Sequence, residues 1–306
     1  MVWLAVLSGM CFSVIGIAYR LGARRGVDPM QIMAVLSLAG AIFFAVRTVA
    51  AYGGYSTYAV ALGFLAGATQ YAVLHFVRAA LRLGPLSLLW CAVMLSFVPV
   101  TLYAGAFLGE RLAATNYATV AAAVACVLVA GLGQGGSMEP AGGGLVTVPR
   151  RLAYAGVLLG ILIFNSVASA CLKDLSTRTD GQGVFLVKHY GDLYMAVLYA
   201  VLFAGVAVDQ VVTRRPPPPR RWLLVLGGIS AAGSIGGFAL LMVCAYLPAA
   251  IVFTVTCVSS ILFTALVATA ALGERRTWAW YATITCGLLA VALANGETIY
   301  AYVFSG

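Results

Sequence analysis

The sequence predicts an all-α membrane protein with ten transmembrane helices, arranged as two inverted repeats of five helices. Composition is the first reason: 63% of the 306 residues are hydrophobic and only 9% are charged, whereas soluble domains carry about 25% charged residues. The second reason is an internal repeat. Gly109-Glu110-Arg111 recurs as Gly273-Glu274-Arg275, and Tyr117-Ala118-Thr119 recurs as Tyr281-Ala282-Thr283, both at an offset of 164 residues (109 to 273, 117 to 281). We therefore expect a polytopic membrane protein with short loops and no soluble domain.

Ten apolar runs are each long enough to cross about 30 Å of hydrocarbon as a helix. A helix is also the open-chain structure that satisfies its own backbone hydrogen bonds in lipid. Turn-forming residues mark several junctions, namely Asp28-Pro29, Gly53-Gly54, Gly84-Pro85 and Pro248. The expected spans are residues 2–20, 30–51, 58–82, 87–108, 113–133, 152–172, 184–211, 222–246, 249–272 and 277–299.

The repeat also predicts the topology. Residues 60–132 align with residues 224–296 at the common offset without a gap. We expect a first five-helix repeat at 1–133, a Gly-rich linker at 134–150 and a second five-helix repeat at 151–306. Because five crossings is an odd number, the second repeat enters the membrane from the opposite side, and the repeats are inverted. Such repeats are typical of transporters that open alternately to the two sides of the membrane.

Basic residues predict an orientation. One set of loops holds thirteen arginines, and the opposite face holds four basic residues, Arg47, Arg111, Lys173 and Arg178. The positive-inside rule makes the arginine-rich face cytoplasmic and leaves both termini outside. The same distribution accounts for the net charge of +9 without a nucleic-acid partner. The thirteen are Arg20, Arg24, Arg25, Arg78, Arg82, Arg150, Arg151, Arg214, Arg215, Arg220, Arg221, Arg275 and Arg276.

The cysteines and the start of the chain add to this prediction. All seven cysteines fall within apolar runs and none forms a CxxC motif, so we expect packing roles, with no disulfide, metal or cofactor. No basic stretch precedes the first span, which argues against a cleavable signal peptide. The excess of arginine over lysine, with abundant Ala and Gly, favours a GC-rich genome. We expect a multi-pass protein of a bacterial inner (cell) membrane.

Three segments of the first half resemble a known family: Ala80-Leu81-Arg82-Leu83-Gly84-Pro85, then Ser96-Phe97-Val98-Pro99, then Phe107-Leu108-Gly109-Glu110-Arg111-Leu112. They are similar to the EamA-type half of the drug/metabolite transporter (DMT) superfamily, and Gly273-Glu274-Arg275 repeats the last of them. The resemblance implies ten helices in two inverted bundles, a central cavity lined by helices one to four and six to nine, and peripheral fifth and tenth helices. Members are usually drawn with both termini in the cytoplasm, opposite to the orientation that the arginines favour. The Gly-Glu-Arg triplets follow helices four and nine, where a structural role at helix ends is expected.

The third predicted helix carries an unusual polar pattern. Tyr71, His75, Arg78 and Arg82 lie at i, i+4, i+7 and i+11, with Gln70 beside them near the middle of the membrane. Polar groups inside a span are unfavourable in lipid and are expected to face a cavity or a partner. We expect Gln70, Tyr71, His75 and Arg78 to contact substrate, although Arg78 is near enough to the end of the span to reach the headgroups.

Three residues of the second half complete the expected substrate site. Asn165 lies near the middle of the sixth predicted helix, where an amide side chain rarely lacks a partner. Lys188 and Asp192 open the seventh helix at i, i+4 and are either an ion pair or a substrate and proton-coupling site. Several serines at similar depth are more typical of packing or of bonds to their own backbone. These are Ser96, Ser166, Ser259 and Ser260.

These features favour a secondary transporter for a small polar metabolite, driven by a coupling proton or by a counter-substrate. Because basic and histidine side chains outnumber buried carboxylates, the sequence favours a substrate with a carboxylate or phosphate, such as an amino acid or a related compound. A nucleotide-sugar or phosphate-ester exchanger of the same superfamily is the nearest alternative. A non-transport intramembrane enzyme and a lipid-handling protein also remain open, although no HExxH or paired Asp motif is present. We expect no enzyme activity, partners limited to the substrate and the lipid bilayer, and a monomer or a homodimer.

Overall fold

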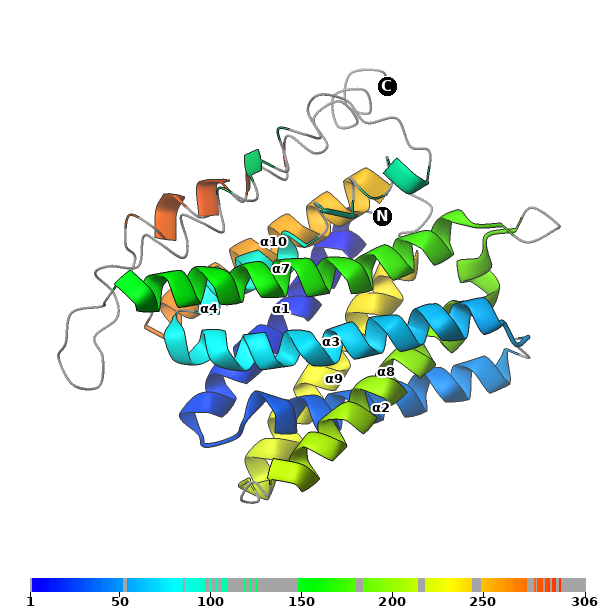
Figure 1. Ribbon diagram of the computed structural model, residues 1–306, viewed down its shortest axis with the longest axis horizontal. Helices are drawn as coiled ribbons and strands as arrows, with labels where there is room; N and C mark the ends of the chain where they lie inside the picture. The colour runs from blue at the N-terminus through cyan, green and yellow to red at the C-terminus, as the bar shows by residue number, and fades with distance from the viewer. Residues whose placement is uncertain are drawn as a thin grey trace.

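The computed structural model describes residues 2–51, 54–84, 86–96, 148–179, 184–213, 218–243 and 249–273, with scattered positions between 99 and 125 and between 278 and 292. These ranges fold into helices that pack side by side in one bundle (Figure 1). The helices are α1 (Val2–Arg24), α2 (Pro29–Ala50), α3 (Thr57–Leu83), α4 (Leu86–Met94), α7 (Val148–Thr177), α8 (Leu186–Thr213), α9 (Arg220–Val243) and α10 (Ala249–Ala270).

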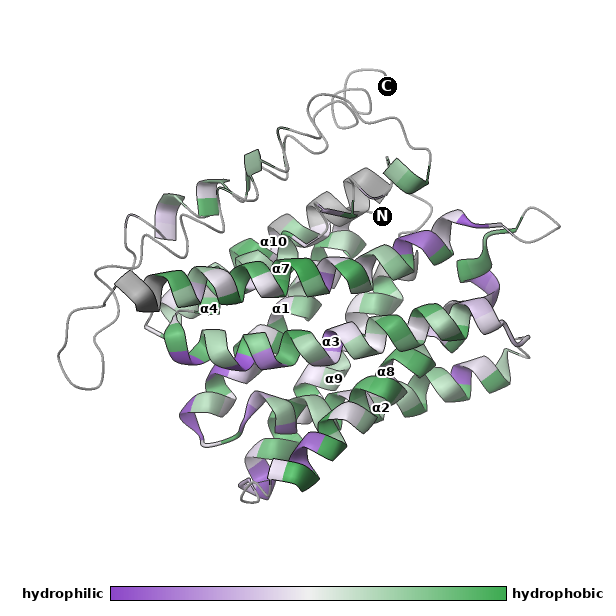
Figure 2. Cartoon of the chain, viewed as in Figure 1, coloured by the Kyte–Doolittle hydropathy of each residue, from purple (hydrophilic) through white to green (hydrophobic). Residues whose placement is uncertain are grey.

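Six of the described helices, α1, α2, α3, α7, α8 and α9, are long and apolar enough to cross a membrane. This confirms an all-helical protein of the membrane-spanning class. Hydrophobic residues make up most of each helix, and hydrophilic residues gather toward the ends (Figure 2). Most of the spans predicted at 113–133 and 277–299 lie outside the described residues, as do residues 134–147 of the predicted linker. The helix α7 begins inside that linker, at Val148.

The helices contact one another in a cyclic order. The most extensive contacts join α10 to α1, α1 to α9, α9 to α2, α2 to α8, α8 to α3 and α3 to α7, and smaller contacts join α7 to α4 and α4 to α10. Every neighbour in this cycle pairs a helix from residues 2–94 with a helix from residues 148–270. The helices of residues 2–94 therefore alternate with the helices of residues 148–270 around one bundle.

Glycines allow these neighbours to approach closely. A Cβ atom added to Gly63 of α3 would lie 2.8 Å from the backbone oxygen of Tyr194 and 3.0 Å from Val197 on α8. A Cβ atom added to Gly227 of α9 would lie 2.6 Å from Val35 on α2. Separations this short require a shift of the neighbour, so each position favours glycine. Small residues at such crossings are the usual packing device of membrane helices.

The helix ends carry conventional caps at the junction of α1 and α2. Gly26 has a φ of +72°, and the backbone N–H of Val27 donates to the oxygen of Gly22 (2.8 Å), so α1 ends in a Schellman motif. Asp28 then caps α2 by accepting from the backbone N–H of Met30 at 3.0 Å. Gly273, which begins the second Gly-Glu-Arg triplet, has a φ of +65° just beyond α10. The first triplet and the rest of the second lie outside the described residues.

Candidate functional site

A cluster of neutral polar side chains joins α3, α7 and the turn after α4. At its centre the Asn165 amide nitrogen donates to the Ser96 hydroxyl (2.6 Å) and to the backbone oxygen of Val93 (3.0 Å). The Gln70 amide nitrogen donates to the Asn165 side-chain oxygen at 2.6 Å. The Ser166 hydroxyl donates to the backbone oxygen of Ser96 at 2.7 Å. We call Gln70, Ser96, Asn165 and Ser166 the amide cluster.

The network fixes which way the two amides face. Of the two Asn165 amide atoms, only the nitrogen can donate to the Val93 carbonyl, so the nitrogen points toward α4 and the oxygen points toward α3. Gln70 must then present its own nitrogen to that oxygen. Within the described part of the chain, this bond is the one hydrogen bond that the Gln70 side chain makes. Its carboxamide oxygen and its second N–H have no hydrogen-bond partner among the described residues.

Gln70 lies on the packed face of α3 and yet is not fully covered. It is two turns from Gly63 in one direction and from Val77 in the other, and both of these residues are buried. The opposite face of the helix carries Phe64 and Leu65, which are 60% and 46% exposed. Gln70 thus keeps partial exposure on the packed face of α3, where Gly63 and Val77 are buried.

Tyr71 and His75 lie apart from this cluster. The Tyr71 ring covers Gly205 of α8, where an added Cβ atom would lie 3.0 Å from the ring. The rings of Tyr71 and His75 meet edge to face with centroids 4.9 Å apart. His75 is exposed on the same side of α3 as Phe64. The sequence pattern identified the polar residues of α3, but the structure brings only Gln70 to Asn165.

Arg78 contacts the start of α2. Its Nε atom lies 2.8 Å from a carboxylate oxygen of Asp28, the residue that caps α2. The N–H of that nitrogen does not point at an acceptor, so the contact is ionic and lacks hydrogen-bond geometry. Both side chains are more than half buried. Arg78 therefore holds the α1–α2 turn against α3, about 12 Å along the helix axis from Gln70.

Lys188 and Asp192 lie at the opposite end of the bundle. Asp192 of α8 forms an ion pair with Arg47 of α2, with Nε and Oδ2 3.2 Å apart. The other carboxylate oxygen of Asp192 is buried and has no hydrogen-bond partner among the described residues. Lys188 is exposed one turn earlier, near the start of α8. This end of the bundle thus holds the ion pair that joins α2 to α8, well away from the amide cluster.

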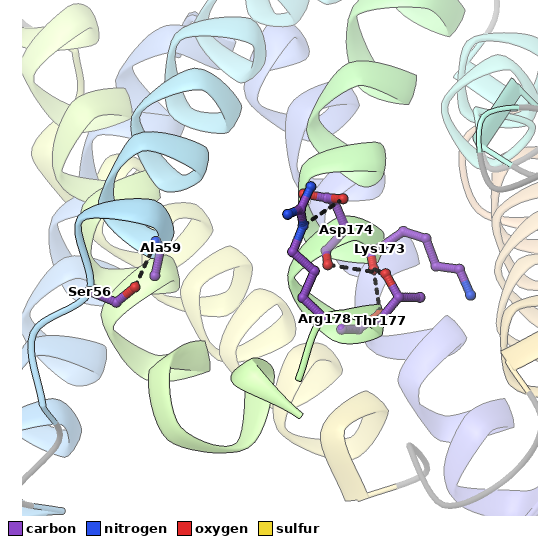
Figure 3. Close-up of polar contacts among 7 residues, drawn as sticks. Ser56, Ala59, Lys173, Asp174, Thr177 and Arg178 are labelled. Carbon is purple, nitrogen blue, oxygen red and sulfur yellow. Dashed lines mark hydrogen bonds and ion pairs between the residues drawn. The ribbon is translucent and has the colours of Figure 1, made fainter. Parts of the chain in front are cut away.

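Asp174 and Arg178 form a further polar contact that the sequence reasoning missed. Asp174 is only 4% exposed, and Arg178 lies 3.3 Å from its carboxylate, one turn later (Figure 3). The guanidinium also lies 4.8 Å from the centre of the Tyr58 ring on α3. The i, i+4 spacing of an acidic and a basic residue was the available signal. The pair lets α7 continue to Thr177, five residues beyond the predicted end of the span.

A second polar cluster joins α1, α4 and α10. The indole N–H of Trp90 donates to the Ser260 hydroxyl at 2.9 Å, and the hydroxyls of Ser13 and Ser260 are 3.0 Å apart. Ser13 also donates to the backbone oxygens of Ser260 and Gly9. Ser13, Trp90 and Ser260 are each 5% exposed or less. We call these three residues the indole cluster, and in contrast to the amide cluster it is closed to other molecules.

Within the described residues, no group of three His, Cys, Asp or Glu side chains is close enough to hold a metal ion. No family model and no curated protein matches the chain. The fold is shared with a solved structure, a crystal structure described only as that of a protein, which is 14% identical with a TM-score of 0.64. The likeness covers 100% of this chain and 98% of that one. At this identity it shows a common fold over the whole length.

Proposed function

We propose that the protein is a secondary transporter, which moves a small polar metabolite across the membrane by alternating access. The observation that carries the proposal is the amide cluster. Gln70 is at the middle of the 27-residue α3, and Asn165 is well inside the 30-residue α7. Polar side chains at such depth are unfavourable in lipid and commonly mark substrate pathways. Gln70 adds to this an acceptor and a donor that no described residue uses.

The interruption of α4 beside the cluster supports the same function. This helix ends at Met94, and residues 99 and 100 are helical again. The side chains of Asn165 and Ser166 bind the backbone oxygens of Val93 and Ser96 at the interruption. Irregular backbone at membrane depth is tolerated where it is buried in protein or lines a watery cavity, and interrupted helices form the substrate sites of many transporters.

The helix order supports two inverted repeats. Suppose that α1, α2, α3 and α4 correspond to α7, α8, α9 and α10. Exchanging the two sets then leaves the cycle of contacts unchanged: the contacts of α2 with α8 and of α4 with α10 map onto themselves, and each of the others becomes another contact of the cycle. The contact of α1 with α9, for example, becomes the contact of α7 with α3. The glycines at the common sequence offset follow the same rule, since Gly63 packs on α8 and Gly227 packs on α2. A structure with this symmetry has two related arrangements, as alternating access requires.

These features together favour the EamA-type branch of the DMT superfamily. The proposal then includes ten helices, repeats at 1–133 and 151–306, and a substrate path enclosed by the cycle of eight helices. Transport is driven by a coupling proton or by a counter-substrate, and no catalysis is assigned to the chain. We place the protein in a bacterial inner membrane.

Counterflow in proteoliposomes tests the proposal. Vesicles with the purified protein are loaded in turn with unlabelled members of a panel of amino acids, sugars, phosphate esters and uncharged polar compounds, and uptake of the labelled compound is followed. We expect saturable counterflow of at least one member. Asn165→Leu should reduce it about tenfold or more, because the change removes the centre of the cluster and leaves Ser96 and Gln70 without their partner.

Thr69→Val is the matched control, because among the described residues the Thr69 hydroxyl bonds only to the backbone oxygens of Leu65 and Ala66 in its own helix. This variant should retain counterflow within about twofold. The proposal fails if no compound shows counterflow, or if a compound is chemically converted without being translocated.

A further inference from the structure

The charged residues of the described helices lie toward the helix ends. On α3, the charged residue nearest to Gln70 is Arg78, and on α7 the one nearest to Asn165 is Lys173. Each is about 12 Å away along its helix at 1.5 Å per residue. No charged residue occurs in residues 2–19, 83–109 or 222–273. The middle of the bundle is therefore bounded by uncharged side chains on α1, α4, α9 and α10 as well.

The polar groups of this middle section are neutral but numerous. They comprise the amide cluster, the indole cluster, and the bonded pair of Tyr199 and Ser234 between α8 and α9. In the amide cluster, the indole cluster and the Tyr199–Ser234 pair, the hydrogen bonds join protein groups to one another. Gln70 differs, because its carboxamide oxygen and one N–H have no partner in the described part of the chain, and it keeps partial exposure.

We infer that the part of the substrate held at the middle of the bundle is an uncharged group that both donates and accepts hydrogen bonds, such as a carboxamide, a urea or a hydroxyl. The inference rests on the transport function proposed above and names the substrate class of the same site. The free edge of Gln70 offers one acceptor and one donor, which is the complement of such a group. A carboxylate or phosphate there would give up its hydration without meeting an opposite charge. This substrate class differs from the carboxylate- or phosphate-bearing substrate that the sequence favours.

Probes that pair a neutral compound with an anionic counterpart test this inference. Nicotinamide and nicotinate, glycerol and glycerol 3-phosphate, and adenosine and AMP form three matched pairs for uptake into proteoliposomes. After subtraction of uptake into protein-free vesicles, we expect at least one neutral member to be taken up about tenfold faster than its charged partner. Faster uptake of the charged members would overturn the inference and leave the transport proposal standing. Uptake of none of the six, together with no counterflow of any compound in the panel above, would count against the transport proposal itself.

The role of Gln70 is tested by Gln70→Glu, which keeps the size of the side chain but adds a negative charge and removes the N–H donors. We expect uptake of the neutral probe to fall about tenfold or more. Gln210→Glu makes the same chemical change near the end of α8 and should change uptake by less than about twofold. Gln70→Met serves as a neutral second variant, with the same loss of uptake expected if the glutamate variant does not fold. Unchanged neutral uptake in a folded Gln70 variant would overturn the inference.

Discussion

Ser96 and Ser260 occupy the same position in the two aligned stretches of the chain, yet their surroundings differ. Ser96 lies in the turn after α4 and accepts from Asn165, whose own oxygen is bound by a partly exposed Gln70. Ser260 lies within the continuous helix α10 and is bound by Ser13 and Trp90. One copy thus supports an accessible amide, and the other supports a sealed contact. The serine is thus the same at the two aligned positions, but its hydrogen-bond partners and the exposure of the residues around it differ.

The sequence supplies a physical cause for this difference. Three residues after Ser96 stands Pro99, and three residues after Ser260 stands Phe263. Proline has no N–H to offer to the carbonyl four residues earlier, and its ring clashes with that carbonyl. The helix therefore breaks at residues 95 and 96, whereas α10 continues without interruption to Ala270. The break turns backbone oxygens toward α7, where Asn165 and Ser166 bind them.

The largest effect is expected from Gly9→Ala, which tests how tightly the indole cluster is closed. A Cβ atom at Gly9 would overlap the backbone oxygen of Thr256 and the Ser259 hydroxyl. Since a backbone atom cannot move aside without separating α1 from α10, the free energy of unfolding should fall by about 3 kcal/mol. Reversible denaturation of the purified protein in mixed micelles measures the loss.

Gly156→Ala is the matched control for Gly9→Ala. Gly156 lies on α7, and an added Cβ atom there would have no neighbour within 4 Å. Alanine should leave the free energy of unfolding unchanged or raise it by up to about 1 kcal/mol, because it restricts the unfolded chain and favours the helix. Equal stability losses in both variants would contradict a tightly closed contact between α1 and α10.

The second effect is expected from Pro99→Ala, which tests whether the break in α4 keeps the amide cluster accessible. Alanine restores an N–H that can bind the Leu95 oxygen, so α4 can continue through the turn at residues 95 and 96. The oxygens of Val93 and Ser96 would then point along the helix axis, and their bonds to Asn165 and Ser166 should weaken. Counterflow should fall about tenfold or more, while the thermal unfolding temperature stays the same or rises.

Pro29→Ala is the control for that change, because Pro29 occupies the first turn of α2, where a proline removes no helical hydrogen bond. It should leave counterflow within about twofold. Undiminished counterflow in folded Pro99→Ala would mean that the break in α4 is not what separates the two serine positions.

Much of the helical framework could be predicted from the sequence. The ends of α1, α2 and α3 were predicted to within a few residues. The signals were the lengths of the apolar runs and the turn-forming pairs Asp28-Pro29 and Gly84-Pro85, which are local in the sequence. Asn165 could also be recognised, since an amide in an apolar helix needs a partner. The identity of that partner was not predictable, because it depends on which helices are neighbours.

The same limit explains what was missed on α3. Helical periodicity groups Tyr71, His75 and Arg78 on one side of the helix, but it does not say which side is covered. Contacts with α7 and α8 leave His75 exposed and turn Gln70 toward Asn165. The ion pair of Arg78 with Asp28 likewise joins residues that are distant in the chain. The cyclic order of the helices is the information that the local patterns lack.

The smallest effect is expected from the matched pair Ser96→Ala and Ser260→Ala, which compares the two positions directly. Ser260→Ala removes the acceptor of a buried indole N–H and the hydroxyl contact with Ser13. An unpaired buried donor costs about 1–3 kcal/mol in soluble proteins, and hydrogen bonds between membrane helices are worth about 0.6 kcal/mol on average. The free energy of unfolding should therefore fall by about 1 kcal/mol, with no change in the substrate concentration that gives half-maximal counterflow.

Ser96→Ala should have the opposite pattern. The Asn165 amide keeps its bond to the Val93 oxygen at 3.0 Å, so the loss of stability should be about 0.5 kcal/mol or less. Its orientation toward Gln70 is held less firmly, however, and the half-saturating substrate concentration should rise about threefold. Titration of counterflow beside denaturation of the same preparations separates the two quantities. If Ser260→Ala weakened substrate binding as much as Ser96→Ala, both copies of the serine would contribute to the site, and the indole cluster would have to open during transport.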